Sequence, residues 1–137
     1  MTPERIAFVL TALAAVVVVL TRVRLASSDD HGAGRLGIPP ALVNVHTAVG
    51  VVAILLWGWF LLGDPGDLVG WIGLACFWVT AVAGLLILAR WLPARGRHAA
   101  SGSTDSWGEG PGLSVLAHVG MVVGCVVWTV FLVAGKL

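Results

Sequence analysis

Residues 40–62 read PALVNVHTAVGVVAILLWGWFLL. The segment holds no Asp, Glu, Lys or Arg, and it meets the length of roughly 20 apolar residues that an α-helix needs to cross a bilayer. Pro39 and Pro40 are suited to a helix start, and Gly63 is suited to its end. The segment therefore predicts a transmembrane helix, and its one ionisable side chain, His46, would lie inside the membrane.

Three further runs share this character. The four predicted spans cover about 6–25, 40–62, 68–92 and 112–134, with Pro93 expected to end the third and Gly135 the fourth. Few residues separate the second span from the third, so these two must be antiparallel neighbours. The sequence thus predicts an all-α fold: an integral membrane four-helix up-down bundle that forms one domain over 1–137.

The composition agrees with a surface that faces lipid. Hydrophobic residues make up 58% of the 137 and charged residues 11%, against about a quarter charged in soluble domains. A net charge of +1 gives no sign of nucleic-acid binding. Arg outnumbers Lys seven to one, which favours a GC-rich bacterial genome. The first span is expected to be retained rather than cleaved, because Arg22 and Arg24 stand where a signal-peptide cleavage site would lie.

Arginine placement predicts the orientation. Six arginines lie in or beside the loops that follow the first and third spans: Arg22, Arg24, Arg35, Arg90, Arg95 and Arg97. The other side has only Arg5 and Lys136 among basic residues. The positive-inside rule then places both termini outside a bacterial cell membrane. Trp57, Trp59 and Trp71 would form an aromatic belt at the outer interface.

The second and fourth spans are weakly alike. His46 and His118 are 72 positions apart, and Trp57 and Trp128 are 71 apart. A repeat of this kind would make the chain two tandem helical hairpins, related by a twofold axis between the second and fourth helices.

The two membrane histidines are the main candidates for a functional site, because ionisable side chains within a span usually face the bundle interior. His46 is six residues past Pro40, and His118 is seven past Pro111, so they lie at similar depth on parallel helices. His31 and His98 fall in polar loops and are expected to be solvated.

The second and fourth helices are diagonal in an up-down bundle, roughly 11–14 Å apart when neighbours are 8–10 Å apart. A flat cofactor with a central iron would fill that gap, with one imidazole on each side. Gly50, one turn from His46, would make room for a porphyrin face. Arg22, Arg24 and Arg90 lie at the same end and are candidates to pair with haem propionates, or to be plain interfacial anchors.

Two segments resemble a known family. NVHTAVG at 44–50 and HVGMVVG at 118–124 are similar to the His-plus-Gly segments of four-helix membrane b-type cytochromes. The resemblance covers only these two helices. It implies one haem b with iron ligated by His46 and His118, and an electron-transfer role as a carrier or as a subunit of an oxidoreductase complex, with other membrane subunits or redox partners.

Other functions stay open. A cofactor-free accessory or assembly subunit of a respiratory complex is the main alternative. A further alternative is quinone binding, with His46 or His118 donating a hydrogen bond to a quinone carbonyl. A zinc site is disfavoured, because Cys76 and Cys125 lie too far along their helices to join the histidines and are better interpreted as small apolar fillers. No acidic residue lies within a span, which disfavours a transporter, and no nucleophile motif indicates a hydrolase.

Overall fold

The computed structural model describes residues 1–27, 40–63, 65–97 and 111–137, with the side chains of 21–22, 24–27, 40, 90–97 and 111–114 outside that description. These residues form α1 (Pro3–Ser27), α2 (Pro40–Leu62), α3 (Asp67–Arg97) and α4 (Pro111–Val133). Each helix is long and apolar enough to cross a membrane. The prediction of an all-α membrane bundle of four helices is confirmed.

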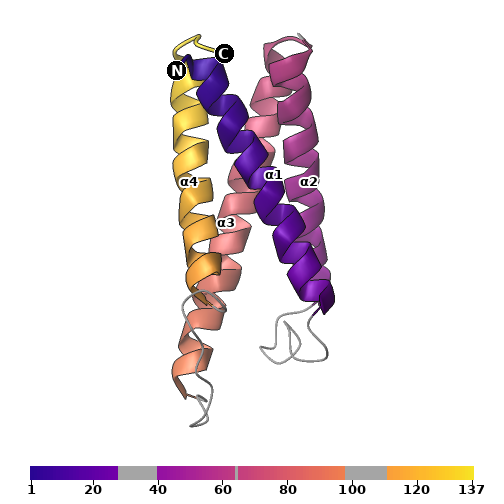
Figure 1. Cartoon of the computed structure of the whole chain (residues 1–137), viewed down its shortest axis with the longest axis vertical. Coiled ribbons are helices and arrows are strands. Elements are labelled where there is room, and N and C mark those ends of the chain that lie inside the picture. Colours follow the sequence, from indigo (N-terminus) through magenta and orange to yellow (C-terminus); the bar gives the residue numbers. More distant parts are fainter. Residues whose placement is uncertain (28–39, 64, 98–110) are drawn as a thin grey trace.

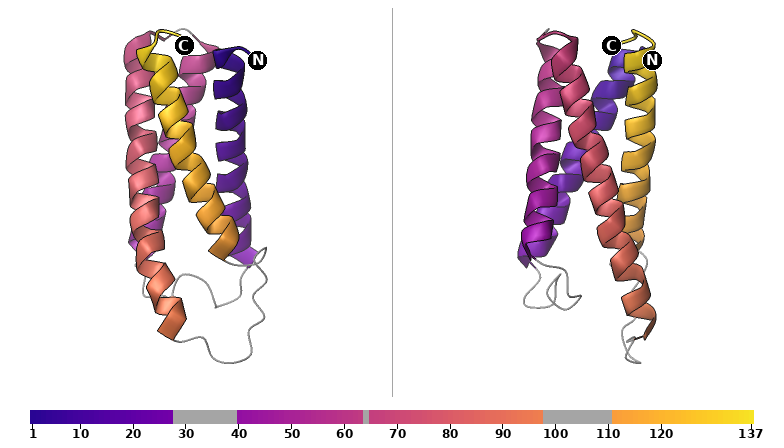
Figure 2. Two further views of the ribbon diagram at one scale, coloured as in Figure 1. Left: turned by 90° about the vertical axis from the view of Figure 1, so that its left-hand side faces the viewer. Right: turned by 180° about the vertical axis from the view of Figure 1, so that it is seen from behind.

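The helices alternate in direction, and each packs mainly against its two neighbours in the ring α1, α2, α3, α4 (Figures 1 and 2). The pairs α1 with α3 and α2 with α4 are therefore diagonal. Both chain termini and the α2–α3 turn lie at one end, here named the terminal end. The opposite end, where α1 finishes and α2 and α4 begin, is named the histidine end. The up-down topology follows the prediction.

The helix limits match the sequence signals except at Pro93. The last turn of α4 closes as predicted at Gly135, whose φ of 60° allows the Gly135 N–H to bond Leu132 O and the Lys136 N–H to bond Phe131 O. However, α3 continues through Pro93 to Arg97, so the prediction that it ends at 92 is wrong. A proline removes one backbone donor and strains the preceding turn, but its fixed φ is still helical.

The closest packing in the bundle is a glycine seam between α2 and α3. A Cβ added to Gly73 would lie 3.1 Å from the backbone nitrogen of Trp57, and one added to Gly50 would lie 3.2 Å from Thr80 Cγ2. The residue numbers of the facing pairs all sum to 130, which fixes one antiparallel register centred on the turn. The pairs are Gly50 with Thr80, Trp57 with Gly73, and Phe60 with Gly70. Small residues permit such approach where lipid gives no hydrophobic drive between helices.

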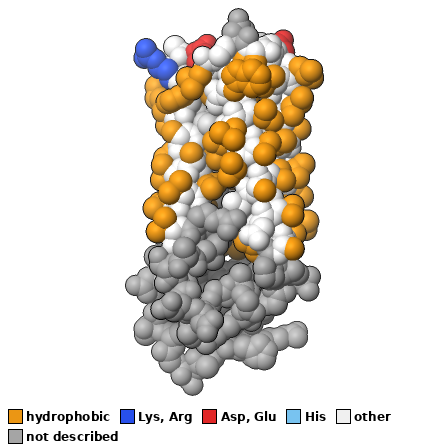
Figure 3. All heavy atoms as spheres, turned by 90° about the vertical axis from the view of Figure 1, so that its right-hand side faces the viewer, with side chains coloured by type: hydrophobic (Ala, Val, Ile, Leu, Met, Phe, Trp, Pro, Cys, Tyr) orange, Lys and Arg blue, Asp and Glu red, His pale blue; other side chains and the backbone are white. Residues whose placement is uncertain are grey.

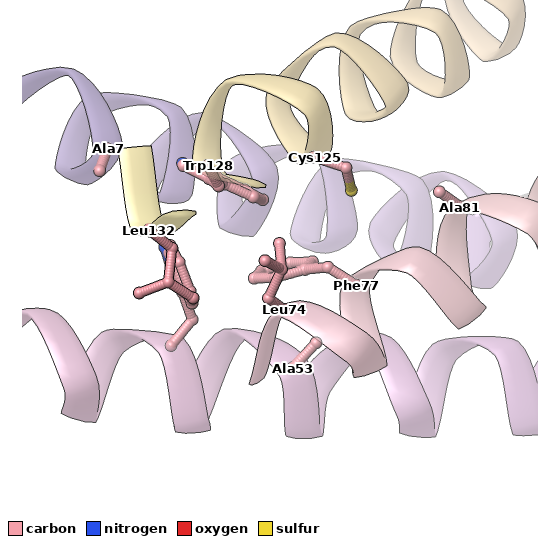
Figure 4. Packing of buried hydrophobic residues seen from close by; sticks show 9 residues of the cluster. Ala7, Ala53, Leu74, Phe77, Ala81, Cys125, Trp128 and Leu132 are labelled. Atoms are coloured by element: carbon pink, nitrogen blue, oxygen red, sulfur yellow. The ribbon is translucent and has the colours of Figure 1, made fainter. Parts of the chain in front are cut away.

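Aromatic rings fill the terminal half of the core. Trp57, Phe77 and Trp128 are fully buried, with ring centroids 5.4 Å apart for Trp57–Trp128 and 4.6 Å for Phe77–Trp128. Figure 4 shows Phe77 and Trp128 from α3 and α4 beside Leu74, Leu132 and Cys125. Trp57 is therefore a core residue, and its predicted place in an interfacial belt is wrong. It lies on the same face of α2 as His46, Gly50 and Ala53, and this face points into the bundle. Trp59 and Trp71 are exposed, as a belt requires.

Four threonine hydroxyls within the helices are satisfied by their own helix. The hydroxyls of Thr11, Thr47, Thr80 and Thr129 each donate to the carbonyl four residues earlier, at 2.7–2.9 Å. Thr129 also accepts a hydrogen bond from the Trp78 indole at 3.1 Å, which links α3 to α4. This pattern leaves the outer surface apolar. On the face in Figure 3, Lys, Arg, Asp and Glu of the described part appear only at the terminal edge.

The contribution of the glycine seam to stability can be tested with two alanine variants, one inside the seam and one outside it. Gly73→Ala should destabilise the bundle by about 1–3 kcal/mol, because the new methyl meets α2 backbone that cannot move aside. Gly58→Ala, on the same hairpin with nothing within 4 Å of its added Cβ, should leave stability unchanged or raise it by up to about 1 kcal/mol, the gain in helix propensity. Reversible unfolding in detergent would measure both values. Equal stability of the two variants would contradict the importance of the seam.

Candidate functional site

His46 and His118 face each other across the bundle. Their ring centroids are 6.1 Å apart, and the ring planes are inclined by 25°. One ring comes from α2 and the other from α4, so the pair spans the diagonal at one depth, as the sequence predicted. Both residues are half-buried. They lie near the starts of α2 (Pro40–Leu62) and α4 (Pro111–Val133) and thus toward the histidine end, where α1 diverges from α4 (Figures 1 and 2).

The repeat-related residues meet in pairs. Trp57 and Trp128 are in contact in the terminal half, and His46 and His118 face each other in the other half. Eleven residues separate His46 from Trp57, which is about 16 Å along the helix. A twofold axis between these helices would produce such pairing, but it would also make the α1–α4 contact like the α2–α3 contact, which is much more extensive; the tandem repeat therefore stays a prediction.

Gly84 of α3 closes one side of the histidine pair. A Cβ added there would lie 2.5 Å from His118 Cδ2, 2.6 Å from His118 Nε2 and 2.9 Å from His46 Cε1. The far edges of both imidazoles thus converge on bare backbone, and any side chain at this position would displace them. The sequence analysis missed Gly84. Counting outward from the turn would have found it, because His46 and Gly84 are both 19 residues from Pro65 (65 − 46 and 84 − 65).

The spacing of the rings suits ligands on opposite sides of one metal. With metal–nitrogen bonds of about 2 Å, two imidazoles placed trans on one ion have centroids roughly 6 Å apart. Within the described part of the chain, no group of three or more His, Cys, Asp and Glu side chains is placed to hold a metal ion. Two imidazoles alone complete a coordination sphere poorly. They fit a metal that brings further donors with it, as the iron of a porphyrin does.

The other predicted site residues lie elsewhere or outside the description. Gly50 is buried one turn from His46, but the contact of its added Cβ would be with Thr80 of α3 rather than with an imidazole. The backbones of Arg22, Arg24 and Arg90 belong to α1 and α3, while their side chains lie outside the description, so propionate pairing stays a prediction. His31 and His98 also lie outside the described residues.

The cysteines take no part in the pair. Cys125 is buried in the aromatic core and Cys76 is half-buried beside it, and both thiols are free. The interpretation of both as small apolar fillers is consistent with these positions.

Comparisons with known proteins do not add to this geometry. No family model, no curated protein sequence and no solved structure matches this chain. The functional argument therefore depends on the side chains themselves.

The position of Gly84 can be tested without any cofactor. In Gly84→Ala the new methyl would overlap both rings, and since these are the ends of flexible side chains, the rings should move while the bundle stays folded. The imidazole ¹⁵N and ¹³C resonances of both His46 and His118 should shift, with unfolding changed by less than about 1 kcal/mol.

Gly120→Ala is the matched control, because its added Cβ has nothing within 4 Å although Gly120 is only two residues from His118. It should leave the His46 resonances in place. Unmoved imidazole resonances in Gly84→Ala would show that α3 does not touch the pair.

Proposed function

We propose that this protein is a membrane electron-transfer protein or cytochrome subunit that holds one haem b between α2 and α4. The observation that carries the proposal is the pair of facing imidazoles, His46 and His118, with centroids 6.1 Å apart inside a bundle of membrane helices. A porphyrin is wider than an imidazole, and both rings already lie against the Gly84 backbone, so the proposal requires α3 to move away from the pair when the cofactor binds.

In this proposal each residue has a defined task. His46 and His118 would hold the haem iron, one from α2 and the other from α4. At Gly84, α3 has no side chain to obstruct its movement away from the pair, and Arg22, Arg24 and Arg90 are the candidates to neutralise propionates at the histidine end. When bound, bis-histidine haem supplies one-electron chemistry with no open position for oxygen or substrate.

The proposed setting is a bacterial cell membrane with both termini outside. The support is the excess of arginine in the segments beyond the histidine end. The histidine pair would then lie nearer the cytoplasmic face, and its electron donor and acceptor would be other membrane subunits or diffusible redox partners.

The haem proposal predicts a spectrum. Protein made in haem-sufficient cells and purified in detergent should show six-coordinate low-spin haem with sharp bands on reduction. His46→Ala and His118→Ala should each lower haem retention by more than about tenfold, because one of the two axial bonds is lost.

His31→Ala and His98→Ala are the controls, since both residues lie in polar segments away from the spans. They should retain haem as the wild type does. Colourless wild-type protein, to which added haem also fails to bind, would remove the proposal and favour a cofactor-free accessory subunit.

The orientation has its own test. A reporter that is active only outside the cytoplasm, fused after Leu137, should be active, and a second fusion in the segment between α3 and α4 should be silent. The reason is the arginine excess on the latter side. The opposite pair of results would reverse the orientation but leave the bundle and the histidine pair unaffected.

A further inference from the structure

The terminal end has a cleft that the histidine site does not involve. As α1 approaches this end it leans toward α4 and away from α2 (Figures 1 and 2). The separation leaves a cleft of about 760 Å³ between the first turns of α1, the last turn of α2 and the start of α3. This volume lies in the range of small-ligand sites.

The lining of the cleft is amphipathic. Its apolar part includes Phe8, Phe60 and Leu62, and its charged side chains are Glu4, Arg5 and Asp67; the two chain ends, Met1 and Leu137, also line it. The membrane spans begin at Pro3 and Asp67 and end at Leu62. The charged groups therefore lie at the boundary of the hydrocarbon region, and the apolar part reaches one to two turns into it.

We propose that this cleft binds a zwitterionic aminophospholipid, with the headgroup at the charged rim and an acyl chain along the apolar part. The charges specify the headgroup. The Arg5 guanidinium can donate two parallel hydrogen bonds to a phosphate. The Glu4 and Asp67 carboxylates can accept hydrogen bonds from a primary ammonium.

Other headgroups fit these charges less well. An anionic glycerol headgroup would meet two carboxylates and only one guanidinium. A choline headgroup has no N–H to donate to Glu4 or Asp67. An ethanolamine headgroup offers both charges and the N–H donors. Because Arg5 and Glu4 are on α1 and Asp67 starts α3, such a lipid would also bridge two diagonal helices.

The test is native mass spectrometry of the full chain, released from detergent after exposure to equal amounts of phosphatidylethanolamine, phosphatidylcholine and phosphatidylglycerol with identical acyl chains. The wild type should retain the ethanolamine lipid at least about fivefold over the other two. Arg5→Gln and Asp67→Asn should each lower that preference about fivefold. Both residues are exposed, so neither change should prevent folding.

Lys136→Gln is the matched control, because Lys136 is exposed at the same end and does not line the cleft. It should keep the wild-type preference. Equal retention of the three lipids, preference for phosphatidylglycerol, or an unchanged preference in both cleft variants would overturn the proposal. None of these outcomes depends on whether haem is bound.

Discussion

The antiparallel contact between α2 and α3 is the constraint on which the rest of the bundle depends. In lipid, two apolar helices gain little by excluding solvent, so they associate where their surfaces can approach closely. Here a glycine lies at each step of the seam, and the numbers of each facing pair sum to 130, from Phe60–Gly70 near the turn, through Trp57–Gly73, to Gly50–Thr80. The same register brings Gly84 opposite His46. The seam that holds the hairpin together therefore also places backbone against the candidate site.

The seam fixes two helices, and α4 completes the interior by packing across the diagonal. Its Trp128 enters the aromatic core against Trp57 and Phe77, and the hydrogen bond from Trp78 to Thr129 attaches it to α3. These contacts set the height and rotation of α4. His118 precedes Trp128 by ten positions on α4, so these contacts also place His118 at the depth of His46. The aromatic core therefore positions the histidine pair.

Much of this was predictable from sequence because membrane physics restricts the choices. Four apolar runs and one short turn suffice to predict the bundle. Because His46 and His118 lie at similar depth in the second and fourth spans, the sequence also predicts that they face each other across the diagonal. The position of Trp57 was predicted wrongly because a tryptophan near a helix end can belong either to an interfacial belt or to the core. The face of the helix decides between them, and Trp57 is on the same face as His46. The role of Gly84 was missed because facing residues depend on interhelical register, which a pattern along one helix does not contain. Pairing of Arg22, Arg24 or Arg90 with a propionate depends on the conformation of a long side chain, which the position in the sequence does not determine.

The tilt of α1 follows from its small number of contacts with the bundle interior. Among the four spans α1 has the smallest buried share and α3 the largest. Its contribution to the core cluster is Ala7, and its buried Thr11 turns its hydroxyl back to its own helix. Leu10 also packs against that cluster, but no large side chain in the described part of α1 is fully buried. With so few interior contacts, α1 crosses from α2 at the histidine end to α4 at the terminal end. That crossing uncovers α2 at one end, where the cleft lies, and separates α1 from α4 at the other, where the imidazoles lie. Both candidate binding regions thus result from one loosely packed helix laid across a tightly packed hairpin.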